Sequence, residues 1–387
     1  MKLLPCISQI QNNIPYRFSI TGTQVYSLEE AIYHTYHYWK QSVDDISDPS
    51  FASWVGETLG LASVASKIKE ITEIDQFSER MLAFLGLIDY FNDQALNALK
   101  LELEQWEKRQ EWETYKERAD NLVNSGRPDR AIALYQRAVQ YEENVPLLNN
   151  LGIAYMQMEN YAEASRYLGK ARELDVDNWE LALNHAEALI LAKRFDDAAD
   201  AIQFAATSTT EAEAIILYLK GELALRMGQN AEAIPYFEKA ITIAAERQYV
   251  FRLADTYTRM RQYDKALQAL RKHATQSTAY SIKVAEIHEQ SGNIDEAIAT
   301  ILSAIKLRSG LPDLWLMLAK YYRLNADLIK AEEAINKALA LDSSNGMVQL
   351  ENARIMKRLG NAKAYQLLLK DILTELKQQY REAHING

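Results

Sequence analysis

The sequence of 387 residues has a single cysteine, Cys6, and few residues that interrupt helices, with 7 prolines and 14 glycines. One cysteine excludes an intramolecular disulfide framework and is typical of a reducing compartment, so we expect a cytoplasmic protein. The scarcity of proline and glycine, together with a hydrophobic content of 48%, indicates a mostly helical chain with enough apolar residues for a continuous core.

Long apolar runs and an excess of positive charge are also missing. No window approaches the roughly 20 apolar residues of a membrane-spanning helix. The apolar run before Cys6 is shorter than the roughly 7–15 residues of a secretion signal. The net charge of −10 and the pI near 5.3 oppose attraction to phosphates. We therefore expect neither nucleic acid nor a membrane among the partners.

Sequence motifs of catalysis are missing as well. A P-loop, a Rossmann glycine fingerprint, HExxH, GxSxG and an EF-hand loop do not occur. His34 and His37 lie one turn apart on a predicted helix, but no second ligand pair follows, so a metal site is not expected. His185 takes the place of a packed leucine and is more typical of a core residue than of a base. We expect no enzyme, no cofactor and no metal.

What the sequence does contain is one pattern repeated along two-thirds of its length. Residues 145–178 show it well, with small residues at the eighth, twentieth and twenty-seventh places and large apolar residues at the fourth, seventh and eleventh. Two helices can approach to about 8–10 Å where the facing residues are small. The eighth place is small in eight successive units, spaced 31 to 35 residues apart, at Ala119, Gly152, Ala186, Gly221, Ala254, Ala285, Ala319 and Ala353. The twentieth place is alanine in the first seven, while Tyr365 falls there in the last unless the register slips to Ala364.

This pattern resembles the tetratricopeptide repeat (TPR) family over about residues 112–376, with the clearest copies at 145–176 and 312–343. The resemblance implies an all-α fold in which helical hairpins wind into a right-handed superhelix. We therefore predict a TPR solenoid of about eight repeats over residues 106–387, ending in a capping helix that becomes polar beyond Leu376. Residues 1–105 would form a separate N-terminal helical domain of no recognised family.

Within the N-terminal part, three features lead to specific expectations. Residues 16–20 and 24–26 alternate around Thr21-Gly22-Thr23, which favours a short β-hairpin. Residues 55–68 have the outline of a helix-turn-helix, but residues 1–110 hold nine Lys and Arg against fifteen Asp and Glu, so we expect an ordinary helical corner. From Asp93 no breaker occurs until Ser125, so we expect one continuous helix that joins the two parts rigidly.

The resemblance also implies a groove. In TPR folds the leading helices line the concave side, and the second, fifth, ninth and twelfth places of each repeat point into it. An apolar fifth residue stands beside an acidic ninth residue in four units and beside a basic one in the last two. The predicted peptide-binding residues are Leu183, Glu187, Tyr218, Glu222, Phe251, Asp255, Ile282, Glu286, Leu316, Lys320, Arg323, Leu350, Arg354 and Lys357.

An apolar floor with charges that change sign along the axis fits a partner with apolar anchors flanked by one basic and one acidic stretch. Two plainer interpretations stay open. A large fifth residue packs on the next repeat in many TPRs, and alternating charges can serve solubility alone. A known TPR ligand, the acidic tail of chaperones, is held by lysines and asparagines. Lys116 and Asn150 match parts of that clamp, but Asp120 would repel a carboxylate.

The sequence thus predicts a non-catalytic scaffold or adaptor that binds a peptide or helix of a partner protein. The alternative is a ligand-gated regulator, because the order of an N-terminal helical bundle, a long helix and a TPR array is similar to that of bacterial peptide-pheromone sensors. An enzyme is a distant third.

Overall fold

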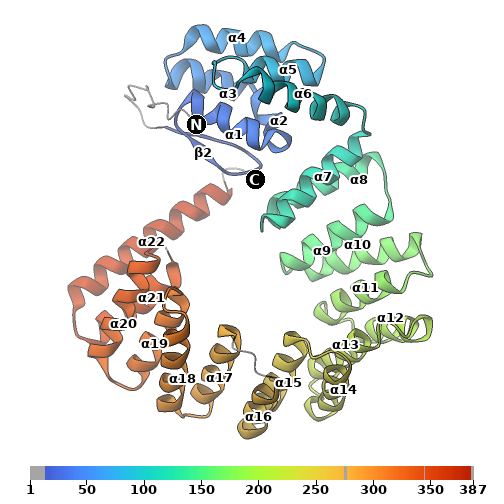
Figure 1. Cartoon of the computed structure of the whole chain (residues 1–387). Helices are drawn as coiled ribbons and strands as arrows, with labels where there is room; N and C mark the ends of the chain where they lie inside the picture. Colours follow the sequence, from blue (N-terminus) through green and yellow to red (C-terminus); the bar gives the residue numbers. More distant parts are fainter. Residues whose placement is uncertain (1–13, 274–276, 344, 385–387) are drawn as a thin grey trace. The chain divides into compact units, whose positions relative to one another are not determined.

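The computed structural model describes residues 14–273, 277–343 and 345–384, and most of these are helical (Figure 1). Within them the β-structure is one two-stranded hairpin, so the all-α fold class predicted from the sequence is confirmed. The N-terminal elements are β1 (Tyr16–Arg17), β2 (Gln24–Val25), α1 (Leu28–His37), α2 (Trp39–Ser47), α3 (Pro49–Ser53), the π-helical turn η1 (Trp54–Thr58), α4 (Ala62–Thr72), α5 (Phe77–Leu85) and α6 (Asp93–Glu107).

The predicted hairpin is confirmed, and its tip contacts the first repeat. Tyr16 pairs with Val25 and Arg17 with Gln24, and Gly22 makes the turn with a φ of +69°. Beyond β1, Ile20 is buried among residues of the first two repeats, including Ala119 and Leu122. The hairpin therefore covers the end of the repeat core, where the first repeat has no preceding repeat to pack against.

Arginines of the first repeat hold the hairpin tip in place. Arg130 donates through Nη1 to the carbonyl oxygens of Ser19 and Ile20, at 2.5 and 2.8 Å, and Arg127 donates to that of Thr21. Burial, followed by the charges of Arg127 and Arg17, lowers the pKa of Arg130. These arginines bond to backbone oxygens, so the contact depends on the path of the hairpin more than on its side chains.

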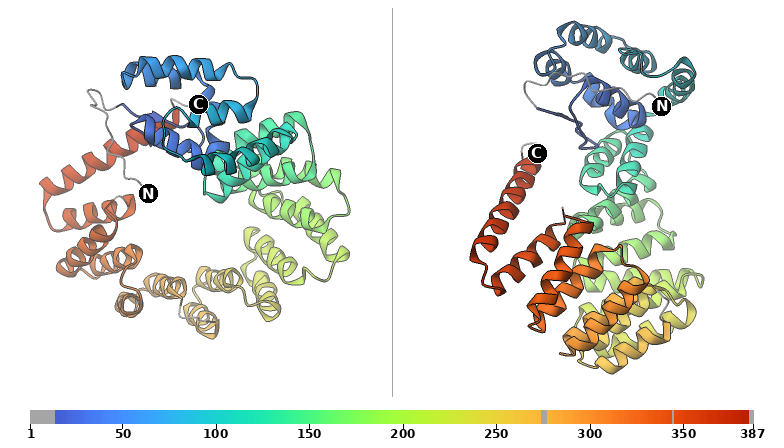
Figure 2. Two further views of the ribbon diagram at one scale, coloured as in Figure 1. Left: turned by 45° about the horizontal axis from the view of Figure 1, so that its top comes forward. Right: turned by 60° about the vertical axis from the view of Figure 1, so that its left-hand side comes forward.

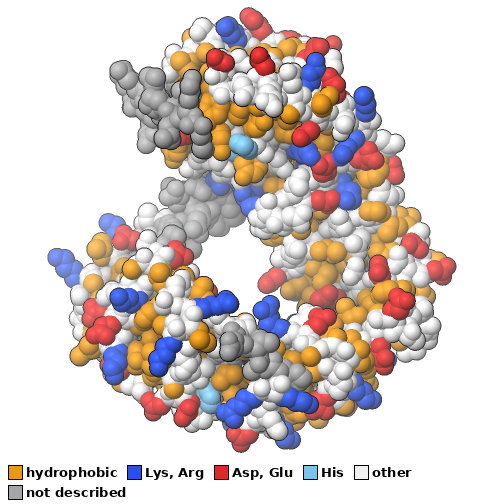
Figure 3. All heavy atoms as spheres, in the orientation of Figure 1, with side chains coloured by type: hydrophobic (Ala, Val, Ile, Leu, Met, Phe, Trp, Pro, Cys, Tyr) orange, Lys and Arg blue, Asp and Glu red, His pale blue; other side chains and the backbone are white. Residues whose placement is uncertain are grey.

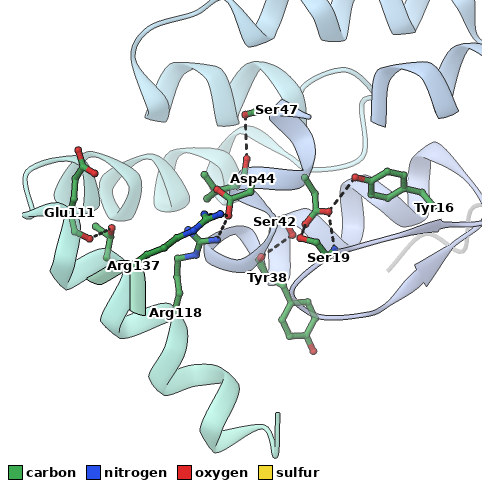
Figure 4. Close-up of polar contacts among 12 residues, drawn as sticks. Tyr16, Ser19, Tyr38, Ser42, Asp44, Ser47, Glu111, Arg118 and Arg137 are labelled. Atoms are coloured by element: carbon green, nitrogen blue, oxygen red, sulfur yellow. Dashed lines mark hydrogen bonds and ion pairs between the residues drawn. The ribbon is translucent and has the colours of Figure 1, made fainter. Parts of the chain in front are cut away.

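Acidic residues of α2 hold both sides of this junction together (Figure 4). Asp45 is buried and accepts hydrogen bonds from the Ser19 amide at 2.8 Å, the Ser19 hydroxyl at 2.9 Å and the Tyr16 hydroxyl at 3.2 Å. Its neighbour Asp44 pairs with Arg118 of the first repeat at 2.8 Å. Adjacent carboxylates on α2 thus bind the hairpin and the first repeat.

The continuous helix predicted between residues 93 and 125 is wrong. The chain forms α6, which ends at Glu107, and α7 (Glu111–Asn124), with an extended Gln110 between them. Gln110 begins the new helix, and its backbone amide donates to the Glu113 carboxylate at 3.1 Å. This capping interaction stabilises the start of α7 and so compensates for the break in the helix. No proline or glycine marks the break in the sequence. The side chains of Leu99, Leu103 and Trp106 on α6 belong to the N-terminal core.

From α7 onward the chain forms helix pairs, each a leading helix followed by a trailing helix (Figure 2). The pairs are α7 with α8 (Pro128–Tyr141), α9 (Val145–Gln157) with α10 (Tyr161–Leu174), α11 (Trp179–Leu191) with α12 (Phe195–Ser208), α13 (Glu213–Arg226) with α14 (Asn230–Ile243), α15 (Arg247–Arg259) with α16 (Tyr263–His273), α17 (Thr278–Gln290) with α18 (Ile294–Leu307), α19 (Pro312–Leu324) with α20 (Leu328–Leu341), and α21 (Gly346–Arg358) with α22 (Ala362–His384).

Contacts divide the chain into two compact units, residues 1–201 and 202–387, and the division falls within α12. The domain boundary predicted between residues 105 and 106 stays a prediction. The polar end predicted for the last helix falls mostly on side chains outside the described residues, although the backbone of α22 continues to His384.

The small residues of the repeat lie where the sequence pattern predicted. All eight residues at the eighth place are buried, as are the seven alanines at the twentieth place. In the fourth repeat Gly221 on α13 faces the fully buried ring of Phe237 on α14. The close approach of the paired helices therefore depends on the missing side chain at this position.

The turn inside each repeat has a common backbone conformation. The residue at the fifteenth place has a positive φ in all eight units. Four of these residues are glycines, and the other four are Glu159, Lys193, Arg261 and Ala326, with φ between 57° and 62°. A left-handed conformation costs roughly 1–2 kcal/mol at a non-glycine residue. The packing of the helix pairs therefore determines this turn even where the local sequence disfavours it.

Gly221→Ala tests the packing constraint directly. A Cβ atom there would lie 2.6 Å from Cε1 of Phe237, so we expect the free energy of unfolding to fall by about 1–3 kcal/mol. Gly346→Ala is the matched control, since a Cβ at Gly346 meets no atom within 4 Å at the start of α21. Urea denaturation of both variants measures the difference. Equal stabilities would show that the eighth place tolerates a larger side chain.

Candidate protein-binding surface

The predicted groove residues all lie on leading helices, from α11 to α21. Within residues 202–387, α13 and α15 lie on the inner side of the arc and α14 and α16 on the outer side (Figure 1). The apolar members of that unit are half-buried, namely Tyr218, Phe251, Ile282, Leu316 and Leu350. Leu183 on α11 is buried, so it has little surface to offer a partner.

The two aromatic residues of the predicted floor pack on the following repeat. The ring of Tyr218 stacks on that of Tyr249, with centroids 4.7 Å apart. The ring of Phe251 meets that of Tyr280 edge-on at 5.0 Å. In both pairs the fifth residue of one repeat contacts the third residue of the next. These rings therefore contribute to repeat packing and expose only part of their surface to a partner.

Most of the predicted rim charges are paired within the protein. Four ion pairs join consecutive leading helices, Glu222 with Arg252 at 2.6 Å, Asp255 with Lys283 at 2.5 Å, Glu289 with Lys320 at 2.7 Å, and Arg323 with Glu351 at 2.5 Å. We call these four pairs the ion-pair ladder. Each pair connects one repeat to the next within residues 202–387, where charges of both signs are interspersed on the visible face (Figure 3).

Half of the ladder was missing from the sequence prediction. Arg252, Lys283 and Glu351 stand at the sixth place of their repeats, and Glu289 at the twelfth place of the sixth repeat. An opposite charge at the sixth place, one repeat after an acid or base at the ninth or twelfth place, is a signal that could have found three of the four pairs. The fourth pair joins Glu289 at a twelfth place to Lys320 at the ninth place of the next repeat. The other predicted charges lie outside the ladder. Glu187, Arg354 and Lys357 are exposed, and the Glu286 carboxylate lies 3.6 Å from the Lys283 ammonium group.

The carboxylate of Glu351 is the most enclosed member of the ladder. Glu351 is 3% exposed, and its oxygens accept from Arg323 at 2.5 Å and from the more exposed Arg354 at 3.1 Å. Removing a carboxylate from water is costly unless its charge is matched by a close partner. The seventh and eighth repeats are therefore connected through a charge that needs Arg323.

In residues 1–201, a hydrogen bond between an amide and a carboxylate joins the leading helices α7 and α9, where the ladder would have an ion pair. Asp120 on α7 accepts from Asn150 on α9 at 3.0 Å and from Tyr135 at 2.6 Å, and it pairs with Lys116 at 2.7 Å. Burial, followed by the hydrogen bond to Asp120, raises the pKa of Tyr135. Lys116 and Asn150, the residues that matched a chaperone-tail clamp, are thus both bound to Asp120.

Two of the histidines that the sequence singled out, His34 and His185, are enclosed by the protein. Burial, followed by the charge of Arg172, lowers the pKa of His185 to about 4, so its imidazole is neutral at neutral pH. His34 is buried, with a pKa also lowered to about 4, and its Nε2 lies 3.0 Å from the Thr21 hydroxyl.

Cys6 lies outside the described residues. Among the residues that the structure describes, no three His, Cys, Asp or Glu side chains gather as metal ligands, and no helix is long and apolar enough to span a membrane.

The ladder makes a stability prediction. Arg323→Met would leave Glu351 buried with Arg354 as its one charged partner among the described residues. We expect the free energy of unfolding to fall by about 3 kcal/mol. Adding Glu351→Leu should restore most of that loss, because an apolar pair of similar volume avoids burying an unmatched charge. Arg354→Met, at an exposed position, should change stability by less than about 1 kcal/mol. Thermal unfolding of the four proteins measures these differences, and a double variant no better than Arg323→Met would contradict the account.

Comparison with known proteins agrees with the repeat architecture. Family models described as tetratricopeptide repeat match residues 122–178 and residues 193–247 together with 282–346. A further model, described as anaphase-promoting complex, cyclosome, subunit 3, matches residues 226–304. These matches fall on the helix pairs from α7 to α21.

Curated relatives and solved structures are similar at low identity. A BBSome complex member BBS4 from Bos taurus is 23% identical over 279 residues, which cover 72% of this chain and 46% of that protein. A BBS4 homolog from Drosophila melanogaster is 28% identical over 130 residues, 31% of this chain and 27% of that protein. The chain thus matches less than half the length of these relatives. A TPR protein from Parabacteroides merdae superposes with a TM-score of 0.45 and 16% identity, covering 64% of this chain and all of that one.

The repeated small residues, the paired helices and the family models agree on one assignment. Each of the three falls on the same stretch of the chain, from α7 onward. The chain is a tetratricopeptide repeat protein.

Proposed function

We propose that the chain is a non-catalytic scaffold subunit that binds other proteins within a larger assembly. Its curated relatives are named as BBSome complex members, and the family model over residues 226–304 describes a subunit of the anaphase-promoting complex. Stacked repeats present an extended surface that suits this role. The observation that carries the proposal is the row of half-buried apolar side chains on successive leading helices.

The proposed contact surface is the face of the leading helices in residues 202–387. Tyr218, Phe251, Ile282, Leu316 and Leu350 expose part of their apolar surface there. A peptide or helix of a partner would bury these parts and gain affinity from apolar contact. Leu183 and Glu222 are buried, so Leu183 would act through packing and Glu222 through its ion pair with Arg252.

The charges play a smaller part in this proposal than the sequence alone suggested. Because the ion-pair ladder places an opposite charge beside most of them, a partner meets a surface of nearly balanced charge. Exposed ion pairs contribute little to affinity and more to association rate. The charge-polarised partner and the ligand-gated regulator both stay predictions, and no feature of the described residues favours the regulator.

Affinity measurement tests the proposed surface. The intact chain, tagged, is used to recover a partner from the source cell, and binding is then measured by titration calorimetry. Tyr218→Ala combined with Phe251→Ala should weaken binding by at least about 2 kcal/mol, because truncated aromatic anchors dominate the energetics of interfaces.

The matched control is Ile243→Ala, which removes an exposed apolar side chain from the trailing helix α14. It should leave affinity unchanged. Since the two aromatic rings also pack on the next repeat, circular dichroism must show that the double variant is folded at the temperature of the titration. A folded double variant that binds like the wild type would mean that the partner binds another surface.

A further inference from the structure

A cluster of aromatic rings lies on the surface of the N-terminal part. The rings come from α1 and from the loop between α5 and α6. The ring centroid of Tyr33 lies 4.4 Å from that of His37 and 6.1 Å from that of Tyr90. The centroids of Tyr90 and Phe91 are 4.8 Å apart. Phe91 in turn stacks on Tyr36 at 4.0 Å. We call Tyr33, Tyr36, His37, Tyr90 and Phe91 the aromatic cluster.

The cluster divides into an inner and an outer part. Tyr36 and Phe91 pack against the N-terminal core, which accounts for their position. Tyr33 is 42% exposed, and His37 is exposed as well. Tyr33 and Tyr90 meet at 79°, so the edge of one ring rests on one face of the other and leaves the opposite face outside this contact. Tyr33 and His37 therefore expose ring surface that packing in the core does not require, while Tyr90 beside them is half-buried.

The charges around the cluster are acidic. Glu29 precedes Tyr33 by four residues on α1 and shares its face of the helix, while Asp89 and Asp93 flank Tyr90 and Phe91 in the sequence. The nearest lysine along α1 and α2, Lys40, is paired with Glu117 and lies over the ring of Trp106 at 5.2 Å. The surface thus combines aromatic rings with carboxylates that lie within four residues of them along the chain.

We propose that the aromatic cluster binds a basic peptide segment whose arginine side chains stack on Tyr33 and Tyr90. Guanidinium groups suit this surface because they are planar, weakly hydrated and attracted to ring faces, and the carboxylates would steer them. The same chemistry occurs inside this protein, where the guanidinium of Arg109 lies 5.7 Å from the ring of Trp106. This site is independent of the proposed leading-helix surface.

Fluorescence anisotropy of the intact chain with a labelled peptide tests the proposal. The probe has arginines spaced by glycine and serine, and parallel peptides carry lysine, glutamine or proline at the arginine positions. The arginine peptide should bind most tightly and the glutamine peptide should not bind. Tyr33→Ala with Tyr90→Ala should raise the dissociation constant of the arginine peptide about tenfold, because two cation–π contacts are lost.

Matched variants separate recognition from folding. Tyr33→Phe with Tyr90→Phe retains the rings and should retain binding. Glu29→Gln with Asp89→Asn should weaken binding at low salt and reduce its salt dependence. Tyr141→Ala removes an exposed tyrosine from α8 and should change nothing. Equal binding of the arginine and glutamine peptides, tighter binding of the proline peptide, or unchanged binding by the alanine double variant would each overturn the proposal.

Discussion

The structure depends on a small residue where the two helices of each repeat meet. At Gly221 this contact leaves no room for a methyl group beside Phe237, and at the other repeats a buried glycine or alanine takes the same position. Close approach of the helices determines which side chains fill the core, and it imposes the positive φ at each turn. The face that a leading helix presents outward follows from the same contact, because packing fixes its rotation.

The proposed function and the stability of the chain share the leading-helix face. Part of the Tyr218 and Phe251 rings packs on the next repeat, and the proposed contact with a partner would use the rest. The ion-pair ladder holds neighbouring leading helices together and balances the charge of the surface that they form. A scaffold built in this way relies on shape and apolar area for affinity. Its specificity then depends on which side chains the repeats leave partly uncovered.

The sequence predicted the repeats well, because the small residues recur at a near-constant period and that period reflects local packing. It predicted the hairpin from the alternation around Gly22. It could not predict the break at Gln110, where a capping interaction ends a helix without a breaker, or the left-handed turn at Ala326, where tertiary packing overrides preference. The partners of the rim charges, such as Arg252 for Glu222, depend on the stagger between repeats, which spacing along one chain does not give.

We propose that the leading helices of residues 202–387 carry the contact surface for a partner protein. Methyl NMR of the intact chain, labelled at isoleucine and leucine, tests it most directly during titration with a recovered partner. The account predicts shifts at Ile282, Leu316 and Leu350 on leading helices, and unchanged signals from Ile243 and Leu302 on trailing helices. Shifts confined to Ile243 and Leu302, with the leading-helix methyl groups unchanged, would contradict it.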